Sequence, residues 1–230
     1  MNPIVSIELK WSYSPLNYFE EPLILNFDEI LLNVDNGTAM AKVTPAQLAN
    51  NSCIKDELNS LLESRFHAIQ IFNHKDFELG PPRRTDIRKD GSKNYYLIVH
   101  SSLQAESIDS IDLVAKDKNG NVISDTKQER LEKQNKYAVA MRRHSKTDSI
   151  LIQLHDSYRM SVKDPANEFV HLYEIRDALK TKFTSKKMAI QKLGITTEQW
   201  DEIGNLANAL PLKQGRHRGE SNGLLRAASP

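Results

Sequence analysis

Apolar residues in the first part of the chain recur in short runs with the two-residue period of β-strands. The runs cover residues 4–9, 22–27, 30–34 and 38–43. Each is bounded by polar or turn-forming residues, which predicts strands. Asn36-Gly37 separates the last two runs and predicts a tight hairpin. Thr44-Pro45 then predicts the start of a helix, because Thr caps helix N-termini and Pro suits the first helical position.

Further apolar runs follow this helix at residues 66–72, 95–100 and 108–115, and each predicts a strand. Residues 79–94 are rich in Pro, Gly and charged side chains, which predicts a polar loop. Residues 1–124 are therefore expected to form a β-rich α+β module with one helix.

From about Thr126 the apolar period changes to the three and four residues of amphipathic helices. Pro165 interrupts this pattern, and Ser185 and Gly194 predict the start and end of a short helix. Thr196 or Thr197 predicts the start of the next helix, which carries Trp200. We expect a helical bundle over residues 125–220, a flexible tail over residues 221–230, and the α+β class for the whole chain.

Composition adds the expectation of a soluble cytoplasmic protein of bacterial character. Only 39% of the 230 residues are hydrophobic and 27% are charged. No apolar run approaches the roughly 18 residues that a membrane helix needs, and the N-terminus lacks a signal-peptide pattern. A single cysteine, Cys53, provides neither an internal disulfide nor a cysteine metal site.

The net charge of +1 is unevenly distributed along the chain. Residues 1–124 contain 12 Lys and Arg against 17 Asp and Glu, and residues 125–230 contain 19 against 13. The excess of basic residues in the second half suggests contact with a polyanion. The alternative is a solvated helical surface, which has the same excess of basic residues without such a partner.

Proton-transferring and phosphate-binding residues are most concentrated near the end of the predicted bundle. Asn208 is followed by Lys213, Arg216, His217 and Arg218. A histidine transfers protons near neutral pH, and an arginine binds phosphate with two parallel hydrogen bonds. This combination of residues suits RNA cleavage without a metal ion. The alternative is a basic segment of the same composition that only binds phosphate or a protein surface.

The residues at 172–179 (LYEIRDAL), 206–208 (LAN) and Arg216-His217 resemble HEPN-type domains of bacterial defence and toxin systems. The resemblance covers about residues 125–220. It implies a helical bundle that pairs as a homodimer and cleaves RNA without metal. The family's arginine precedes its histidine by several residues, whereas Arg216 is adjacent to His217. His217 is therefore the expected catalytic residue, with Arg216 and Asn208 as partners.

Lys213, Arg216, Arg218 and Arg176 are the residues expected to bind nucleic acid. A non-enzymatic adaptor for nucleic acid or protein is the alternative, which includes a divergent helix-turn-helix DNA binder over residues 186–208. Its second helix carries Glu198, Asp201 and Glu202 without Lys or Arg, and phosphates repel such a helix.

Other candidate constellations are weak. His67, His74 and His100 lack metal-ligand spacing, and residues 117–121 (DKNGN) lack the closing glutamate of a calcium loop. Phosphate-binding and dinucleotide-binding glycine motifs are absent from the sequence. No metal and no cofactor are therefore expected.

Overall fold

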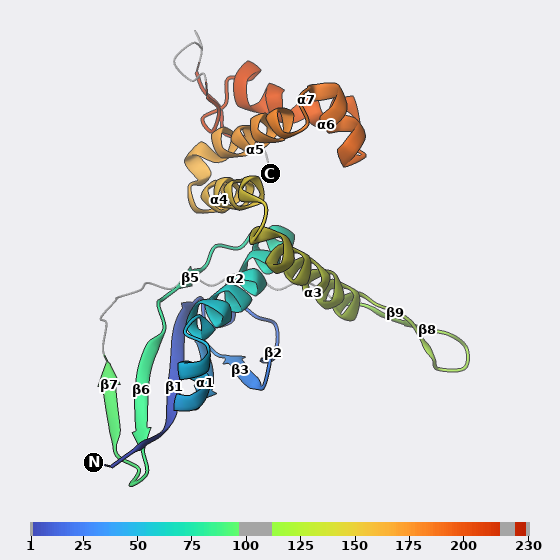
Figure 1. The fold of residues 1–230 in the computed structure, drawn as a ribbon. Helices are drawn as coiled ribbons and strands as arrows, with labels where there is room; N and C mark the ends of the chain where they lie inside the picture. Colours follow the sequence, from blue (N-terminus) through green and yellow to red (C-terminus); the bar gives the residue numbers. More distant parts are fainter. Residues whose placement is uncertain (1, 97–111, 217–223, 229–230) are drawn as a thin grey trace. The chain divides into compact units, whose positions relative to one another are not determined.

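An antiparallel sheet forms in the first part of the chain in the computed structural model, which describes residues 2–96, 112–216 and 224–228 (Figure 1). Its strand order is β2-β3-β4-β1-β6-β7, with β5 pairing at the end of β1. The strands are β1 (Ile4–Ser14), β2 (Leu23–Phe27), β3 (Ile30–Asp35), β4 (Thr38–Val43), β5 (Glu78–Leu79), β6 (Arg83–Arg88) and β7 (Lys93–Tyr96).

The predicted hairpin and the strands on either side of it are confirmed. Asp35 of β3 pairs with Thr38 of β4, and Asn36 and Gly37 both have positive φ angles, 39° and 78°. Two successive positive φ angles are what the tight turn between twisted strands requires.

The predicted helix start at Thr44 is also confirmed. The Thr44 hydroxyl accepts from the Gln47 backbone N–H at 3.1 Å, and the Gln47 side chain accepts from the Thr44 N–H at 2.8 Å. This helix ends after six residues, and the segment predicted as one helix forms two, α1 (Pro45–Asn50) and α2 (Ile54–Asn73).

Two predictions in this region are wrong. Residues 66–72 belong to α2, because Leu58, Leu62, Phe66 and Ile69 continue one helical face that is buried against the sheet. Residues 83–88, predicted as loop, form β6, because their backbone pairs with β1 and the buried Asp86 bonds Arg84 at 2.7 Å.

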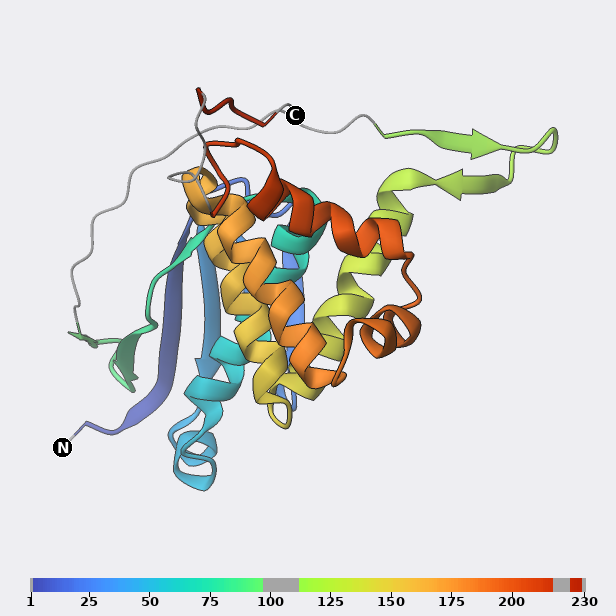
Figure 2. The same ribbon diagram turned by 90° about the horizontal axis from the view of Figure 1, so that it is seen from above.

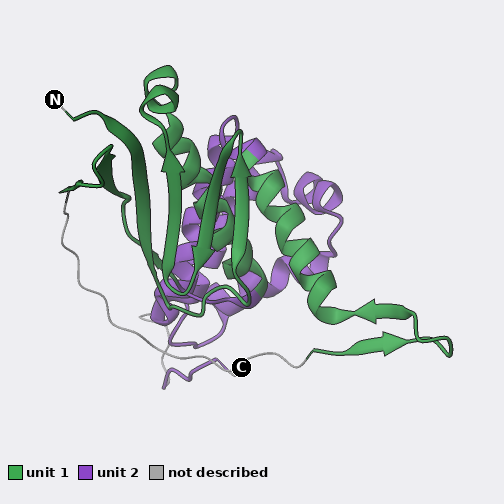
Figure 3. Ribbon diagram, turned by 90° about the horizontal axis from the view of Figure 1, so that it is seen from below, with its two compact units in different colours: residues 1–72, 77–142 green, residues 73–76, 143–230 purple. Residues whose placement is uncertain are grey.

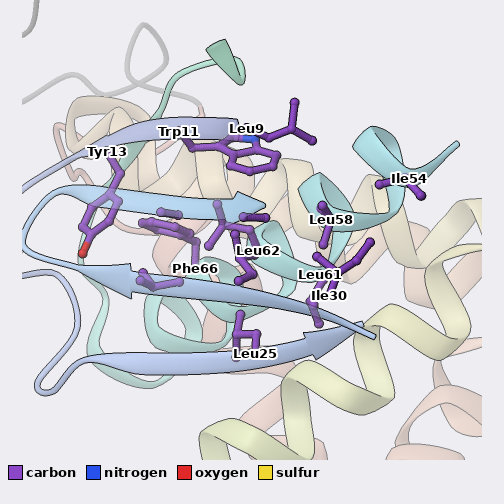
Figure 4. Packing of buried hydrophobic residues seen from close by; sticks show 14 of the residues in the cluster. Leu9, Trp11, Tyr13, Leu25, Ile30, Ile54, Leu58, Leu61, Leu62 and Phe66 are labelled. Atoms are coloured by element: carbon purple, nitrogen blue, oxygen red, sulfur yellow. The ribbon is translucent and has the colours of Figure 1, made fainter. Parts of the chain in front are cut away.

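The hydrophobic core lies between the sheet and α2 (Figure 4). Phe66 is fully buried within ring contacts to four aromatic neighbours at 4.8–5.2 Å, namely Tyr13, Tyr18, Phe19 and Phe77. The Tyr18 hydroxyl donates to the Phe66 carbonyl at 2.9 Å, and Trp11 Nε1 donates to Asn59 Oδ1 at 3.0 Å. These bonds satisfy the polar atoms that the aromatic side chains bring into the core.

A two-stranded ribbon of β8 (Val114–Lys116) and β9 (Val122–Asp125) leads into α3 (Thr126–Ser145), as Figure 2 shows. Arg130 attaches the start of α3 to Glu20 and Asp112 at 2.7–2.8 Å, and Arg142 attaches its end to Glu57 at 3.1 Å. The rest of the strands predicted at residues 95–100 and 108–115 lies outside the described residues.

The second part of the chain is helical, as predicted. Its helices are α4 (Ser149–Lys163), η1 (Pro165–Asn167), α5 (Glu168–Lys182), α6 (Lys186–Leu193), α7 (Thr197–Gly204) and the π-helical turn η2 (Asn205–Ala209). Ser185 and Thr196 cap α6 and α7, and Gly194 ends α6 with φ at 65°. The α+β class and these three boundary predictions are confirmed.

The chain forms two compact units, and the boundary between them falls within α3 (Figure 3). Unit 1 contains residues 1–72 and 77–142, and unit 2 contains residues 73–76 and 143–230. The first part of α3 thus belongs to unit 1, because its arginines bond side chains of that unit. The modules predicted from the sequence, at residues 1–124, 125–220 and 221–230, have other boundaries than these two units. Whether each module folds independently stays a prediction.

Unit 2 is expected to lose stability as the pH falls below the ordinary histidine value of 6.5, because burial lowers the pKa of His155 on α4. The folded unit then binds fewer protons at this site than the unfolded chain, so folding becomes less favourable as the unfolded histidine protonates. Hydrogen exchange of the α4 amides at about pH 7.5 and about pH 5.5 checks this.

His155→Gln is expected to reduce the difference in exchange between the two pH values. The matched control is His144→Gln, which changes an exposed histidine. An unchanged pH dependence in the His155 variant would contradict the prediction.

Candidate nucleic-acid interface

Two arginines of unit 2 lie over the ring of one tyrosine. Helix α5 carries Tyr173 and Arg176, and their three-residue spacing puts both on one helix face. The Arg176 guanidinium carbon lies 5.0 Å from the Tyr173 ring centre, and that of Arg216 lies 4.4 Å from the same centre. The ring thus joins α5 to the loop that follows η2.

Arg176 is engaged mainly in packing. Its guanidinium also lies 5.3 Å from the ring centre of Trp200, a buried residue of α7, and 3.9 Å from the Asp201 carboxylate. A Cβ at Gly204 would lie 3.2–3.3 Å from the guanidinium, so the glycine gives Arg176 its space beside α7. With a side chain only 18% exposed, Arg176 connects α5 to α7 and offers little surface to a ligand.

Arg216 lies on the loop that follows η2, and a backbone hydrogen bond attaches this loop to η2. Its backbone N–H donates to the Ala207 carbonyl at 2.6 Å. A Cβ on the preceding Gly215 would lie 3.0 Å from that same carbonyl oxygen, so a larger residue cannot take this place without a shift. Arg216 is exposed, and among the described residues its side chain has no carboxylate partner. Its guanidinium is therefore positioned by Tyr173 and open to an anion.

Lys213 precedes Arg216 on the same loop, and a late segment of the chain holds it in place. The Lys213 N–H donates to the Arg226 carbonyl at 2.9 Å, and the Arg226 N–H donates to the Pro211 carbonyl at 3.0 Å. The Lys213 side chain is exposed and makes no ion pair with a described residue. Residues 224–228 of the predicted tail thus include a segment that pairs with this loop.

Asn208 lies on η2, and its Oδ1 is buried without a donor among the described residues. A π-helical turn is uncommon and is frequent at functional sites. Arg216 donates its N–H to the backbone of Ala207, the residue before Asn208, and no hydrogen bond reaches Asn208 Oδ1 from Arg216 or another described residue. His217 and Arg218 lie outside the described residues, so their roles stay predictions.

The charge around Tyr173 is positive. Arg176 lies 3.9 Å from the Asp201 carboxylate, whose two oxygens lie 2.6 and 2.7 Å from the Lys186 ammonium group. Glu198 also interacts electrostatically with Asp201 and Lys186. Asp201 and Glu198 thus lie close to Arg176 and Lys186, and Arg216 is the cation of this group that has no carboxylate partner among the described residues and can attract an anion.

Tyr173 and Trp200 were not among the site residues predicted from the sequence. The spacing of Tyr173 and Arg176 on one helix is a signal that could have singled out Tyr173. Nothing local indicates that Trp200 meets Arg176, because the two lie on different helices.

The helices α6 and α7 are joined by the turn that a helix-turn-helix requires, at residues 194–196. Ala189 and Trp200 are buried, and the exposed face of α7 carries Glu198 and Glu202. This face has the wrong charge for the major groove of DNA.

Comparison with models of protein families, with curated proteins and with solved structures found no match. Within the described parts of the chain, no group of three or more His, Cys, Asp or Glu side chains is arranged to hold a metal ion. No helix in those parts is both long and apolar enough to cross a membrane.

Proposed function

We propose that unit 2 binds single-stranded RNA through Arg216 and Lys213. The observation that carries the proposal is the exposed Arg216 guanidinium, held on Tyr173 without a carboxylate partner among the described residues. An arginine in this state binds a phosphate with two parallel hydrogen bonds, and Lys213 adds a second positive charge on the same loop.

Two features of the described residues favour RNA over duplex DNA, the stacked pair of Tyr173 and Arg216 and the acidic helix α7. Unpaired bases stack on aromatic rings and on guanidinium planes, and the Tyr173–Arg216 pair offers such a plane. Duplex DNA needs a basic helix or ribbon in a groove, whereas α7 is acidic.

The proposal extends to cleavage without a metal ion. His217 is the acid or base that moves the proton, and Arg216 neutralises the scissile phosphate. What supports this step is the hydrogen bond from Arg216 to the Ala207 carbonyl, which fixes the backbone of the residue before His217.

The double variant Arg216→Ala, Lys213→Ala is expected to bind single-stranded RNA more weakly and with a smaller salt dependence. Each lost phosphate contact lowers the slope of log K against log salt by about 0.7 for a single strand. Fluorescence anisotropy with a labelled RNA at several salt concentrations measures both quantities, and Lys187→Ala, an exposed lysine of α6, is the control. An unchanged slope in the double variant would place the RNA elsewhere.

Cleavage is tested with the same RNA in the presence of a chelator. Wild type should cut it, and His217→Ala should retain binding and lose cleavage. RNA binding by wild type without cleavage supports the non-enzymatic alternative. Absence of binding refutes the proposed function and favours a module that binds protein.

A further inference from the structure

The ribbon of β8 and β9 belongs to unit 1 and forms a sheet of its own, separate from the seven-stranded sheet (Figure 2). Its turn is closed by Asp117, whose carboxylate accepts the backbone N–H groups of Asn119 and Asn121 at 2.8 and 2.9 Å. Neither strand pairs with a further strand among the described residues. Two strands by themselves are marginally stable in water, so the ribbon gains stability from any partner that covers one of its faces.

Four aliphatic side chains of the ribbon are exposed to solvent. Leu113, just before β8, and Val114 are 67% and 54% exposed. Val122 and Ile123 of β9 are 56% and 69% exposed. A single exposed aliphatic residue is common on protein surfaces, whereas a concentration of them marks a surface that another molecule covers.

The register of the two strands puts Val114, Lys116, Val122 and Asp125 on one side, which we call the ribbon face. Val114 lies opposite Asp125, and Lys116 lies opposite Val122. Directly opposite residues project to the same side of a sheet, and so do residues two positions apart on one strand. Leu113 precedes Val114 by one residue and therefore belongs to the other side.

The ribbon face has opposite charges at its two ends. Lys116 lies towards the turn, and Asp125 lies where β9 joins α3. The Asp125 carboxylate accepts the Gln128 backbone N–H at 3.0 Å, and neither Lys116 nor Asp125 has an ion pair with a described residue. A two-fold axis through the centre of such a face brings each lysine to the aspartate of the other copy. The ribbon face is therefore complementary in charge to itself.

We infer that the ribbon face is a contact surface for a second copy of this chain, with the two ribbons packed face to face across a two-fold axis. Val114 and Val122 of the two copies cover one another, and Lys116 of each copy pairs with Asp125 of the other. This contact differs from the pairing through the helical bundle that the HEPN resemblance implies, and it does not depend on RNA binding by unit 2. One ribbon offers a small surface, and interfaces below about 1,200 Å² are typical of weak complexes, so we expect a micromolar dissociation constant.

Sedimentation velocity of the full chain between about 1 and 300 μM measures this association. Wild type should convert from monomer to dimer, and added salt should weaken the dimer because it screens exposed ion pairs. Lys116→Glu sets two carboxylates against each other at both ends of the contact, so we expect a dissociation constant at least about tenfold higher. Lys55→Glu makes the same change of charge at an exposed lysine of α2 and should associate like wild type.

A second substitution tests whether Asp125 is the group that Lys116→Glu repels. Asparagine caps helices as aspartate does, so Asp125→Asn retains the bond to the Gln128 N–H and removes the charge. The double variant Lys116→Glu, Asp125→Asn should associate several-fold more tightly than Lys116→Glu alone. Equal association of these two variants would overturn the proposed charge pair.

Two serine substitutions distinguish the sides of the ribbon. Val122→Ser should weaken association, and Leu113→Ser, on the other side, should leave it unchanged. Both side chains are exposed, so the melting temperature and the circular dichroism of both variants should match wild type. The inference is overturned if wild type stays monomeric, if its dimer tolerates both Lys116→Glu and Val122→Ser, or if Leu113→Ser weakens it as much as Val122→Ser does.

Discussion

Phe66→Ala is expected to destabilise unit 1 by about 3–5 kcal/mol, because it removes a fully buried ring and leaves a cavity. Phe66 contacts four aromatic rings, and its carbonyl accepts the hydroxyl of the buried Tyr18. A domain typically has only about 5–15 kcal/mol of stability in total, so this loss leaves a large unfolded fraction. Urea unfolding followed by circular dichroism measures the change.

Phe72→Ala is the matched control, on the same helix six residues further along. Phe72 is 44% exposed, and we expect its replacement to cost less than about 1 kcal/mol. The pair also tests the helix itself. In a strand, residues 66 and 72 would face the same side and have similar environments, whereas a helix turns them apart. Equal losses for the two variants would contradict the helical assignment.

Trp200→Ala is expected to destabilise unit 2 by about 3–5 kcal/mol, because Trp200 is only 3% exposed and its loss opens space between α5 and α7. The change also removes one of the two rings against which Arg176 lies. Hydrogen exchange of the amides of α5, α6 and α7 measures the loss within this unit, and the amides of unit 1 serve as an internal reference.

Trp200→Phe separates packing from hydrogen bonding at the same position. The Nε1 of Trp200 is buried without a hydrogen-bond partner among the described residues, so a phenyl ring loses no such bond there. We expect this variant to lose about half as much stability as Trp200→Ala or less. A loss as large as that of the alanine variant would indicate that Nε1 has a partner.

The hairpin and the helix boundaries could be predicted from the sequence because each depends on residues a few positions apart. Asn36 and Gly37 adopt positive φ angles at low cost, and a side chain at Thr44, Ser185 or Thr196 bonds an N–H three residues later. The sequence predicted these features correctly, with one exception at the break between α1 and α2.

The errors at residues 66–72 and 83–88 arise from interactions with distant residues. An apolar run of seven residues fits a buried strand or one face of a helix, and burial against the sheet decides for the helix. The charged segment at 83–88 has little strand propensity, and pairing with β1 overrides it.

The candidate interface shows the same division. The sequence indicated Lys213, Arg216, Arg218 and Arg176 as nucleic-acid-binding residues and could not distinguish between these arginines. The structure shows Arg176 engaged in packing between Tyr173 and Trp200, and Arg216 exposed on Tyr173.

The sequence by itself thus determined the α+β class, the turns, the caps and the location of the basic cluster, since these follow from local geometry and composition. Only the tertiary structure decided which apolar run is helix, which arginine is available to an anion, and where donors lie buried without acceptors. These features depend on burial and charge compensation by elements distant in the chain, and a local pattern carries no information about such partners.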